Sequence, residues 1–212
     1  MDKKHIQNYI QIKNDILKLS TNTNFIVVSK NQSTNLIEDI LKLGQIHFGE
    51  NKLQETIIKW TALKAAYPKT ILHFIGPIQT NKVKGIFNIF DYIHSLDNKK
   101  LVDKFFDEEV KSKKKLKYFI QVNLDNEIQK RGVHIKDLQS FISYCIGANL
   151  NLQGLMCIPP LNKESKFFYA LLKDLAEKND LKYLSMGMSN DFQDALSMGS
   201  TWVRIGSKIF TN

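Results

Sequence analysis

The chain has 212 residues, an apolar fraction of 43% and a formal net charge of +9. The length fits one α/β domain, and no apolar run approaches the roughly 18 residues of a membrane span. The polar start, Met1 to Lys13, is unlike a secretory signal. The two cysteines, Cys145 and Cys157, have neither a metal-ligand spacing nor the pattern of a disulfide framework. We therefore expect a single domain over residues 1–212, located in the cytoplasm, with no bound metal and no membrane contact.

The excess of positive charge raises the question of nucleic-acid binding. Only two of the 30 basic residues are arginines, Arg131 and Arg204. Recognition of phosphates and bases favours arginine, so a solvated lysine surface is the better interpretation. A nucleic-acid-binding barrel remains the weaker alternative.

The elements follow a regular order along the chain. An amphipathic stretch with apolar positions from Ile6 to Leu17 predicts an initial helix. Eight short β-branched or aromatic runs then alternate with longer amphipathic stretches. The predicted strands are Phe25–Ser29, Ile46–Gly49, Ile71–Ile75, Tyr92–Ser95, Tyr118–Asn123, Gln153–Cys157, Lys182–Met186 and Trp202–Ile205. One predicted helix opens at Ser189 as its N-cap and ends at Gly199.

Strands that alternate with helices predict a parallel sheet, and the number of eight predicts a closed (β/α)8 TIM-type barrel with an extra N-terminal helix. An open doubly wound sheet is the alternative fold. That fold should carry a glycine-rich turn after its first strand, whereas the segment from Val27 to Gln32 contains no glycine.

Polar residues at the carboxyl ends of barrel strands are the first candidates for a functional site. Lys30 ends the first strand after three apolar residues, so we expect its stem to emerge from the barrel interior. Removal from water disfavours an ammonium ion, and a neutral amine can form a Schiff base. The simpler alternative is a lysine that reaches into solvent.

Two later segments have the parts of a phosphate site. Met186–Ser189 follows the seventh strand, and Arg204–Ser207 follows the eighth. Glycine backbones, two hydroxyl groups and a helix N-terminus favour an anion, and barrels often bind phosphate at these two loops. Ordinary capping by Ser189 and an ordinary turn at Gly206 are the alternatives.

Two further residues lie near predicted strand ends or within a strand. Asn51 could bind a ligand or cap the next helix. His73 begins an apolar strand, where a core histidine is the better interpretation. The sequence around these two residues does not decide between a ligand contact and a purely structural role.

Taken together, the motifs resemble those of the pyridoxal 5′-phosphate (PLP) homeostasis protein family, which is related to the N-terminal barrel of alanine racemase. The resemblance runs from about Phe25 to Phe210, with the motifs in the family's order. They are Val27–Lys30, Phe48–Asn51, His73–Pro77 with Asn81 and Lys82, Gly154–Met156, Leu184–Ser189, Gly199–Thr201 and Val203–Ser207.

The resemblance implies a fold-type III PLP barrel with PLP bound covalently as an aldimine at Lys30. It implies that Ser189, Gly206 and Ser207 hold the phosphate and that Arg204 faces the pyridine nitrogen. It also places Asn51 and His73 near the cofactor. Members of the family buffer PLP or deliver it, and PLP-dependent apo-enzymes are the expected recipients.

A PLP-dependent amino-acid racemase is the alternative function. Racemisation needs a base on each face of the substrate, and the racemases supply the second base from another domain. The chain stops after the eighth strand, which leaves no residues for such a domain. We therefore expect a PLP carrier without robust catalysis rather than an enzyme, and a monomer.

Overall fold

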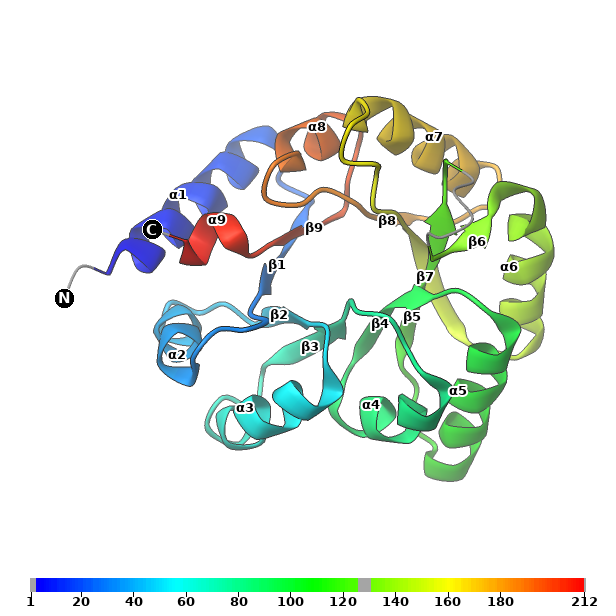
Figure 1. Cartoon of the computed structure of the whole chain (residues 1–212), viewed down its shortest axis with the longest axis horizontal. Helices are drawn as coiled ribbons and strands as arrows, with labels where there is room; N and C mark the ends of the chain where they lie inside the picture. Colours follow the sequence, from blue (N-terminus) through cyan, green and yellow to red (C-terminus); the bar gives the residue numbers. More distant parts are fainter. Residues whose placement is uncertain (1–2, 126–130, 212) are drawn as a thin grey trace.

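The computed structural model describes residues 3–125 and 131–211. Strands and helices alternate along the chain, and Figure 1 shows the strands around a centre with the helices outside them. The strands are β1 (Asn24–Val28), β2 (His47–Glu50), β3 (Ile71–Phe74), β4 (Tyr92–Leu96), β5 (Lys117–Asn123), β6 (Val133–His134), β7 (Asn151–Met156), β8 (Tyr183–Ser185) and β9 (Trp202–Ile205). The helices are α1 (Lys4–Leu19), α2 (Thr34–Lys42), α3 (Leu53–Ala66), α4 (Val83–Ile89), α5 (Lys99–Ser112), α6 (Leu138–Gly147), α7 (Ser165–Glu177), α8 (Phe192–Ser197) and α9 (Ser207–Phe210), with short 3₁₀ turns at Thr80–Lys82 and Ile135–Asp137.

The sheet closes on itself. All strand pairs are parallel, in the order β4-β3-β2-β1-β9-β8-β7-β5, and β4 also pairs with β5. Over the described residues this gives a closed barrel of eight strands, so the predicted TIM-type fold is confirmed. The ninth strand, β6, was not predicted, because its two residues only extend the edge of β5 at Val122 and Asn123.

The predicted N-terminal helix is also confirmed, as α1. The last helix, α9, has only four residues, and α1 packs beside it and against α2 and α8 (Figure 1). Asn8 of α1 donates to the carbonyl of Ile209 at 3.2 Å. Its neighbour Tyr9 is buried and stacks on Phe25 of β1. The extra helix therefore covers the seam between the first and last strands that a short α9 leaves uncovered.

The barrel has two distinct cores because side chains alternate between the faces of a strand. The large apolar core lies between the strands and the helices, where Phe48 of β2 packs on Trp60 of α3. A smaller cluster fills the barrel interior: Ile26, Tyr92, Phe119, Met156 and Trp202. The buried polar residues His73, His94, Ser185 and Arg204 share this interior.

No helix in the described parts of the chain is both long enough and apolar enough to span a membrane.

Candidate functional site

Lys30 lies in a turn just beyond β1 and is exposed to solvent. This exposure agrees with the simpler alternative of a lysine that reaches into solvent, and the position of its stem stays a prediction. The strand ends at Val28, and the next residues form a turn in which the Gln32 amide donates to the Ser29 carbonyl at 3.2 Å. Asn31 adopts a positive φ of 60°, which turns the backbone away from the strand direction. The exposed position leaves the Lys30 amine accessible from solvent.

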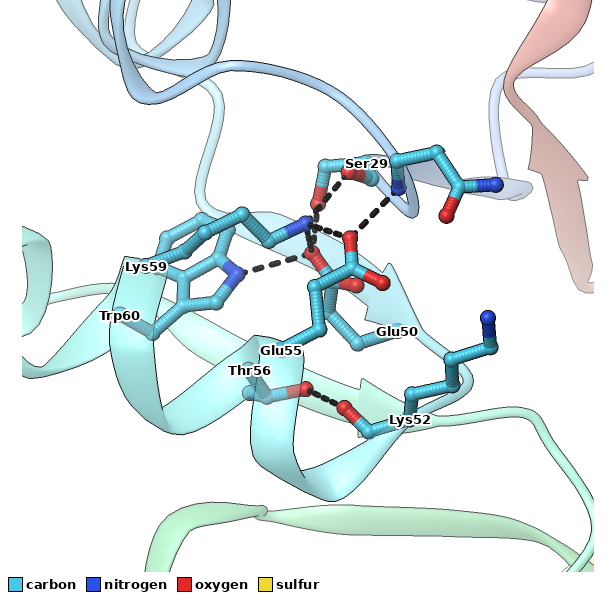
Figure 2. Close-up of polar contacts among 8 residues, drawn as sticks. Ser29, Glu50, Lys52, Glu55, Thr56, Lys59 and Trp60 are labelled. Atoms are coloured by element: carbon cyan, nitrogen blue, oxygen red, sulfur yellow. Dashed lines mark hydrogen bonds and ion pairs between the residues drawn. The ribbon is translucent and has the colours of Figure 1, made fainter.

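A buried ionic cluster holds the backbone on both sides of Lys30 (Figure 2). We call it the Lys59 cluster; its members are Ser29, Glu50, Glu55, Lys59 and Trp60. On one side, the Ser29 hydroxyl donates to Glu50 Oε1 at 2.7 Å, and Lys59 Nζ donates to the Ser29 carbonyl at 2.8 Å. On the other side, the Asn31 amide donates to Glu55 Oε1 at 2.6 Å. Lys59 lies 2.7 Å from each of the two carboxylates.

The cluster neutralises a carboxylate that would otherwise be costly to bury. Glu50 is fully buried, and its Oε1 also accepts from Trp60 Nε1 at 3.0 Å. Burial alone would raise the pKa of Glu55, but hydrogen bonds from Lys59 and the Asn31 amide bring it below its ordinary value. Sequence reasoning missed this cluster. Its one local signal was the i,i+4 spacing of Glu55 and Lys59, which is typical of a helical ion pair.

The two loops with phosphate-binding character meet at Ser189. Its hydroxyl oxygen accepts from the backbone amides of Gly206 and Lys208 at 3.4 and 3.3 Å. Gly206 lies so close to β1 that an added Cβ would be 2.8 Å from the Val28 carbonyl oxygen. Ser207 begins α9 directly after it. The structure thus brings Ser189, Gly206 and Ser207 together, next to the strand end that precedes Lys30.

The expected helix start at Ser189 is wrong. Helix α8 begins at Phe192, and Asp191 is its N-cap residue. The Asp191 carboxylate accepts from the Met188 amide at 2.6 Å, whereas the Ser189 hydroxyl is engaged with the last loop. Asp191 holds the N-cap position without a side-chain hydrogen bond to the helix, and the amides of the final loop are the better anion donors here.

Arg204 is a buried cation whose hydrogen-bond partners in the described residues are uncharged. It is 4% exposed, and in the described parts of the chain no carboxylate lies within ion-pairing distance of it. Nη1 donates to Ser185 Oγ at 2.7 Å and Nη2 to the Cys157 carbonyl at 3.0 Å. Burial lowers its pKa, but a guanidinium remains charged at neutral pH. A desolvated charge of this kind favours a ligand that accepts hydrogen bonds.

Asn51 and His73 differ in their availability to a ligand. Asn51 follows β2, and its Oδ1 is buried without a hydrogen-bond partner. The ring nitrogens of His73 both lie within hydrogen-bonding distance of other histidines, at 3.0 Å from His47 and 2.9 Å from His94. This geometry favours the core-histidine interpretation of His73, inside the barrel rather than at its mouth.

A cavity of about 600 Å³ lies beside the ends of β2 and β3. Among the predicted site residues only Asn51 lines it, together with three cationic side chains, Lys52, Lys82 and Arg131. Lys30, Ser189 and Arg204 lie outside this lining. The cavity therefore adjoins the predicted site without containing it.

Comparisons with known proteins place this geometry in a family. Residues 2–211 match the family model described as alanine racemase, N-terminal domain. The chain is 37% identical to the pyridoxal phosphate homeostasis protein of Vibrio alginolyticus, over 87% of the chain and 84% of the relative. It is 31% identical to the protein of the same name from Haemophilus influenzae, over 99% of the chain and 95% of the relative.

Solved structures agree with these sequence matches. The PLP-bound structure of PipY from Synechococcus elongatus is 29% identical and has a TM-score of 0.88, with 97% of this chain and 99% of PipY covered. An alanine racemase from Clostridium difficile, at 12% identity and a TM-score of 0.75, shares the fold over 56% of its length. The chain therefore belongs to the pyridoxal phosphate homeostasis protein family, which is built on the alanine racemase N-terminal barrel.

Proposed function

We propose that this protein binds PLP at the mouth of the barrel, covalently through Lys30, and serves to buffer or deliver it. The observation that carries the proposal is Arg204, a buried guanidinium whose partners are a hydroxyl and a carbonyl. Such a group is suited to donate to the unprotonated nitrogen of a pyridine ring. The PLP-bound structure of PipY, a relative of nearly the same length, supports the choice of ligand.

The residues present fit the parts of PLP. Ser189, Gly206 and Ser207 would hold the phosphate, because backbone amides converge there on a single hydroxyl oxygen. The close approach of Gly206 to Val28 places this loop next to the strand that leads to Lys30. Asn51, with its free buried oxygen, would contact a ring substituent. His73 would act indirectly, through other residues of the barrel interior.

The same features favour a carrier over an enzyme. When bound, PLP supplies an aldehyde that condenses with amines and a ring that withdraws electrons. A permanently charged Arg204 would keep the ring nitrogen unprotonated and so weaken that withdrawal. An exposed Lys30 lies in water, whereas catalysis favours a site closed from solvent. Exposure suits a protein that must take up its ligand and release it.

The proposal includes a monomer that acts in the cytoplasm and passes PLP to PLP-dependent apo-enzymes. Exposed large apolar side chains support the monomer, because they are spread over separate helices, such as Ile58 on α3, Ile146 on α6 and Phe167 on α7. Light scattering of the purified protein tests this state. Reactivation of a PLP-dependent apo-enzyme by the loaded protein tests the transfer.

Reduction and peptide mapping test the covalent link. PLP added to the protein should give a visible absorbance band, and borohydride should fix the label on Lys30. The variant Lys30→Ala should lose both, while Lys82→Ala, which removes a half-buried lysine of the neighbouring cavity, should keep both. A colourless wild-type protein, or a Lys30→Ala protein that retains the band, would refute the assignment.

Kinetics distinguish the carrier from the racemase. We expect alanine and serine racemisation to stay at background in the PLP-loaded protein. Turnover of about 1 s⁻¹ or more, which is common among true enzymes, would favour the racemase instead.

A further inference from the structure

A continuous chain of hydrogen bonds runs through the barrel interior to Arg204. His47 Nδ1 lies 3.0 Å from His73 Nε2, and His73 Nδ1 lies 2.9 Å from His94 Nε2. His94 Nδ1 lies 2.8 Å from Ser185 Oγ, which accepts from Arg204 at 2.7 Å. The three inner members, His73, His94 and Ser185, are fully buried. We call these four residues, without Arg204, the histidine chain.

All three histidines are neutral at physiological pH. Burial lowers the pKa of His47 to about 4, with a smaller effect from Lys117. Burial lowers the pKa of His73 and of His94 well below the ordinary value, and the charge of Arg204 adds to the effect on His94. Each ring therefore carries one N–H group and one bare nitrogen.

The hydrogen-bond geometry then fixes which nitrogen carries the hydrogen. A guanidinium can only donate, so Ser185 Oγ must accept from Arg204. Among the described residues the other partner of that hydroxyl is His94 Nδ1, at 2.8 Å, so we infer that the Ser185 hydrogen points to it. His94 Nδ1 is therefore bare, and its Nε2–H group donates to His73. By the same step, His73 donates from Nε2 to His47.

The reverse order of donors is unfavourable. If His94 carried its hydrogen on Nδ1, Ser185 Oγ would accept from both His94 and Arg204. The Ser185 hydrogen would then be buried with no further acceptor among its hydrogen-bond partners in the described residues, and a buried unpaired donor costs about 1–3 kcal/mol in proteins.

We propose that the histidine chain has one fixed direction, with Nε2–H on all three rings, and that it positions Arg204. In this direction every lone pair faces the guanidinium and every N–H group faces away from it. The aligned dipoles stabilise a buried cation that has no carboxylate within ion-pairing distance among the described residues, and they hold its plane through Ser185. In the described parts of the chain these histidines form no metal-binding group with Cys, Asp or Glu. The direction itself does not rest on the proposed PLP binding, but the positioning role does.

Nitrogen NMR of histidine-labelled protein tests the direction. The chain has five histidines, and His5 and His134 lie outside the histidine chain and serve as internal references. We expect three rings in the pure Nε2–H form at neutral pH. An Nδ1–H form, a mixture of forms or a charged ring at His73 or His94 would overturn the proposal. The wild-type spectrum alone decides this, whether or not the variants fold.

Replacement of Ser185 tests the positioning role. Ser185→Ala should release His94 from its fixed form and weaken PLP binding by roughly tenfold, the effect of one lost hydrogen bond to a charged group. Ser185→Thr, which keeps a hydroxyl, should preserve both properties. Equal loss of affinity in the two variants would refute positioning by the hydroxyl. Fixed ring forms in a wild-type protein that does not bind PLP would refute the proposed function and leave the direction intact.

Discussion

The histidine chain makes stability depend on pH in a range where few other groups titrate. In the unfolded protein each histidine has an ordinary pKa near 6.5, and in the folded protein the pKa is lowered for all three rings. The unfolded state therefore binds more protons, and stability that is present above pH 6.5 is lost as the pH falls. For His47 the loss continues down to about pH 4.

The expected magnitude follows from proton linkage. Each ring that stays neutral in the folded protein but is protonated in the unfolded one contributes about 1.4 kcal/mol per pH unit. Between pH 7.5 and pH 5 this amounts to about 2 kcal/mol for each histidine and about 6 kcal/mol for the three. The whole stability of a domain is about 5–15 kcal/mol, so the loss should range from roughly two fifths of the stability to all of it. Carboxylates held below their ordinary pKa, such as Asp39 and Glu55, lose their contribution mainly at lower pH.

Urea unfolding at several pH values between 7.5 and 5 measures the effect. The slope of the unfolding free energy against pH gives the number of protons taken up on unfolding. This number should approach three at pH 5, and it should fall by about one in His47→Gln. The charged groups that act on these rings, Lys117 and Asp91 near His47 and Arg204 near His94, remain in this variant. A flat profile above pH 5 would refute the reasoning. The variant His5→Gln removes a histidine on α1, outside the histidine chain. If it lowered the slope as much as His47→Gln does, the slope would not be a property of the histidine chain.

Three further predictions concern other parts of the molecule. Lys59→Met should destabilise the protein by about 3–5 kcal/mol in urea unfolding, because it leaves buried Glu50 unpaired, whereas Lys42→Met, which breaks an exposed pair with the same i,i+4 spacing, should have little effect. Gly206→Ala should cost about 1–3 kcal/mol through its clash with Val28 and should weaken PLP binding in a fluorescence titration, while Gly147→Ala, where a Cβ meets nothing within 4 Å, should do neither. DNA affinity should be weak and should collapse with added salt in an electrophoretic shift assay; tight binding to a particular sequence would contradict the interpretation of the lysine-rich surface.

The fold was predictable because its signals are local. Each strand of the barrel is a short apolar run with its own boundaries, and each of the eight predicted runs overlaps a strand of the structure. The helix before β1 was visible from the spacing of Ile6, Tyr9 and Ile16, of which Tyr9 and Ile16 are buried. Hydrophobic period and strand count are sufficient for a fold that repeats one unit.

The site was less predictable because its details depend on distant partners. The exposed turn around Lys30 was not predicted, because the acceptor that holds the Asn31 amide, Glu55, is 24 positions further along the chain. Ser189 was expected to cap α8 because serine is a good capping residue. Asp191 occupies the N-cap position instead, without a side-chain cap bond, and the Ser189 hydroxyl is engaged with Gly206 and Lys208. Propensity identifies candidates, and tertiary contacts choose among them.

The histidine chain depends on the register of the barrel, which no local pattern contains. His47 pairs with Ile71, so His73 lies one inward position further along its strand. His73 in turn pairs with Tyr92, so His94 lies one inward position further again. On the opposite wall Ser185 pairs with Trp202, and Arg204 is the next inward residue after it.

The histidine chain therefore follows the offset between neighbouring strands, from the start of β2 towards the end of β9. A shift of one residue in either the β2–β3 or the β3–β4 pairing would turn a histidine to the other face of the sheet and break the connection. A buried polar network of this kind has favourable energy only when every member is paired. The histidine chain and the barrel register thus support each other, and Arg204 lies at the end of the network in the last strand.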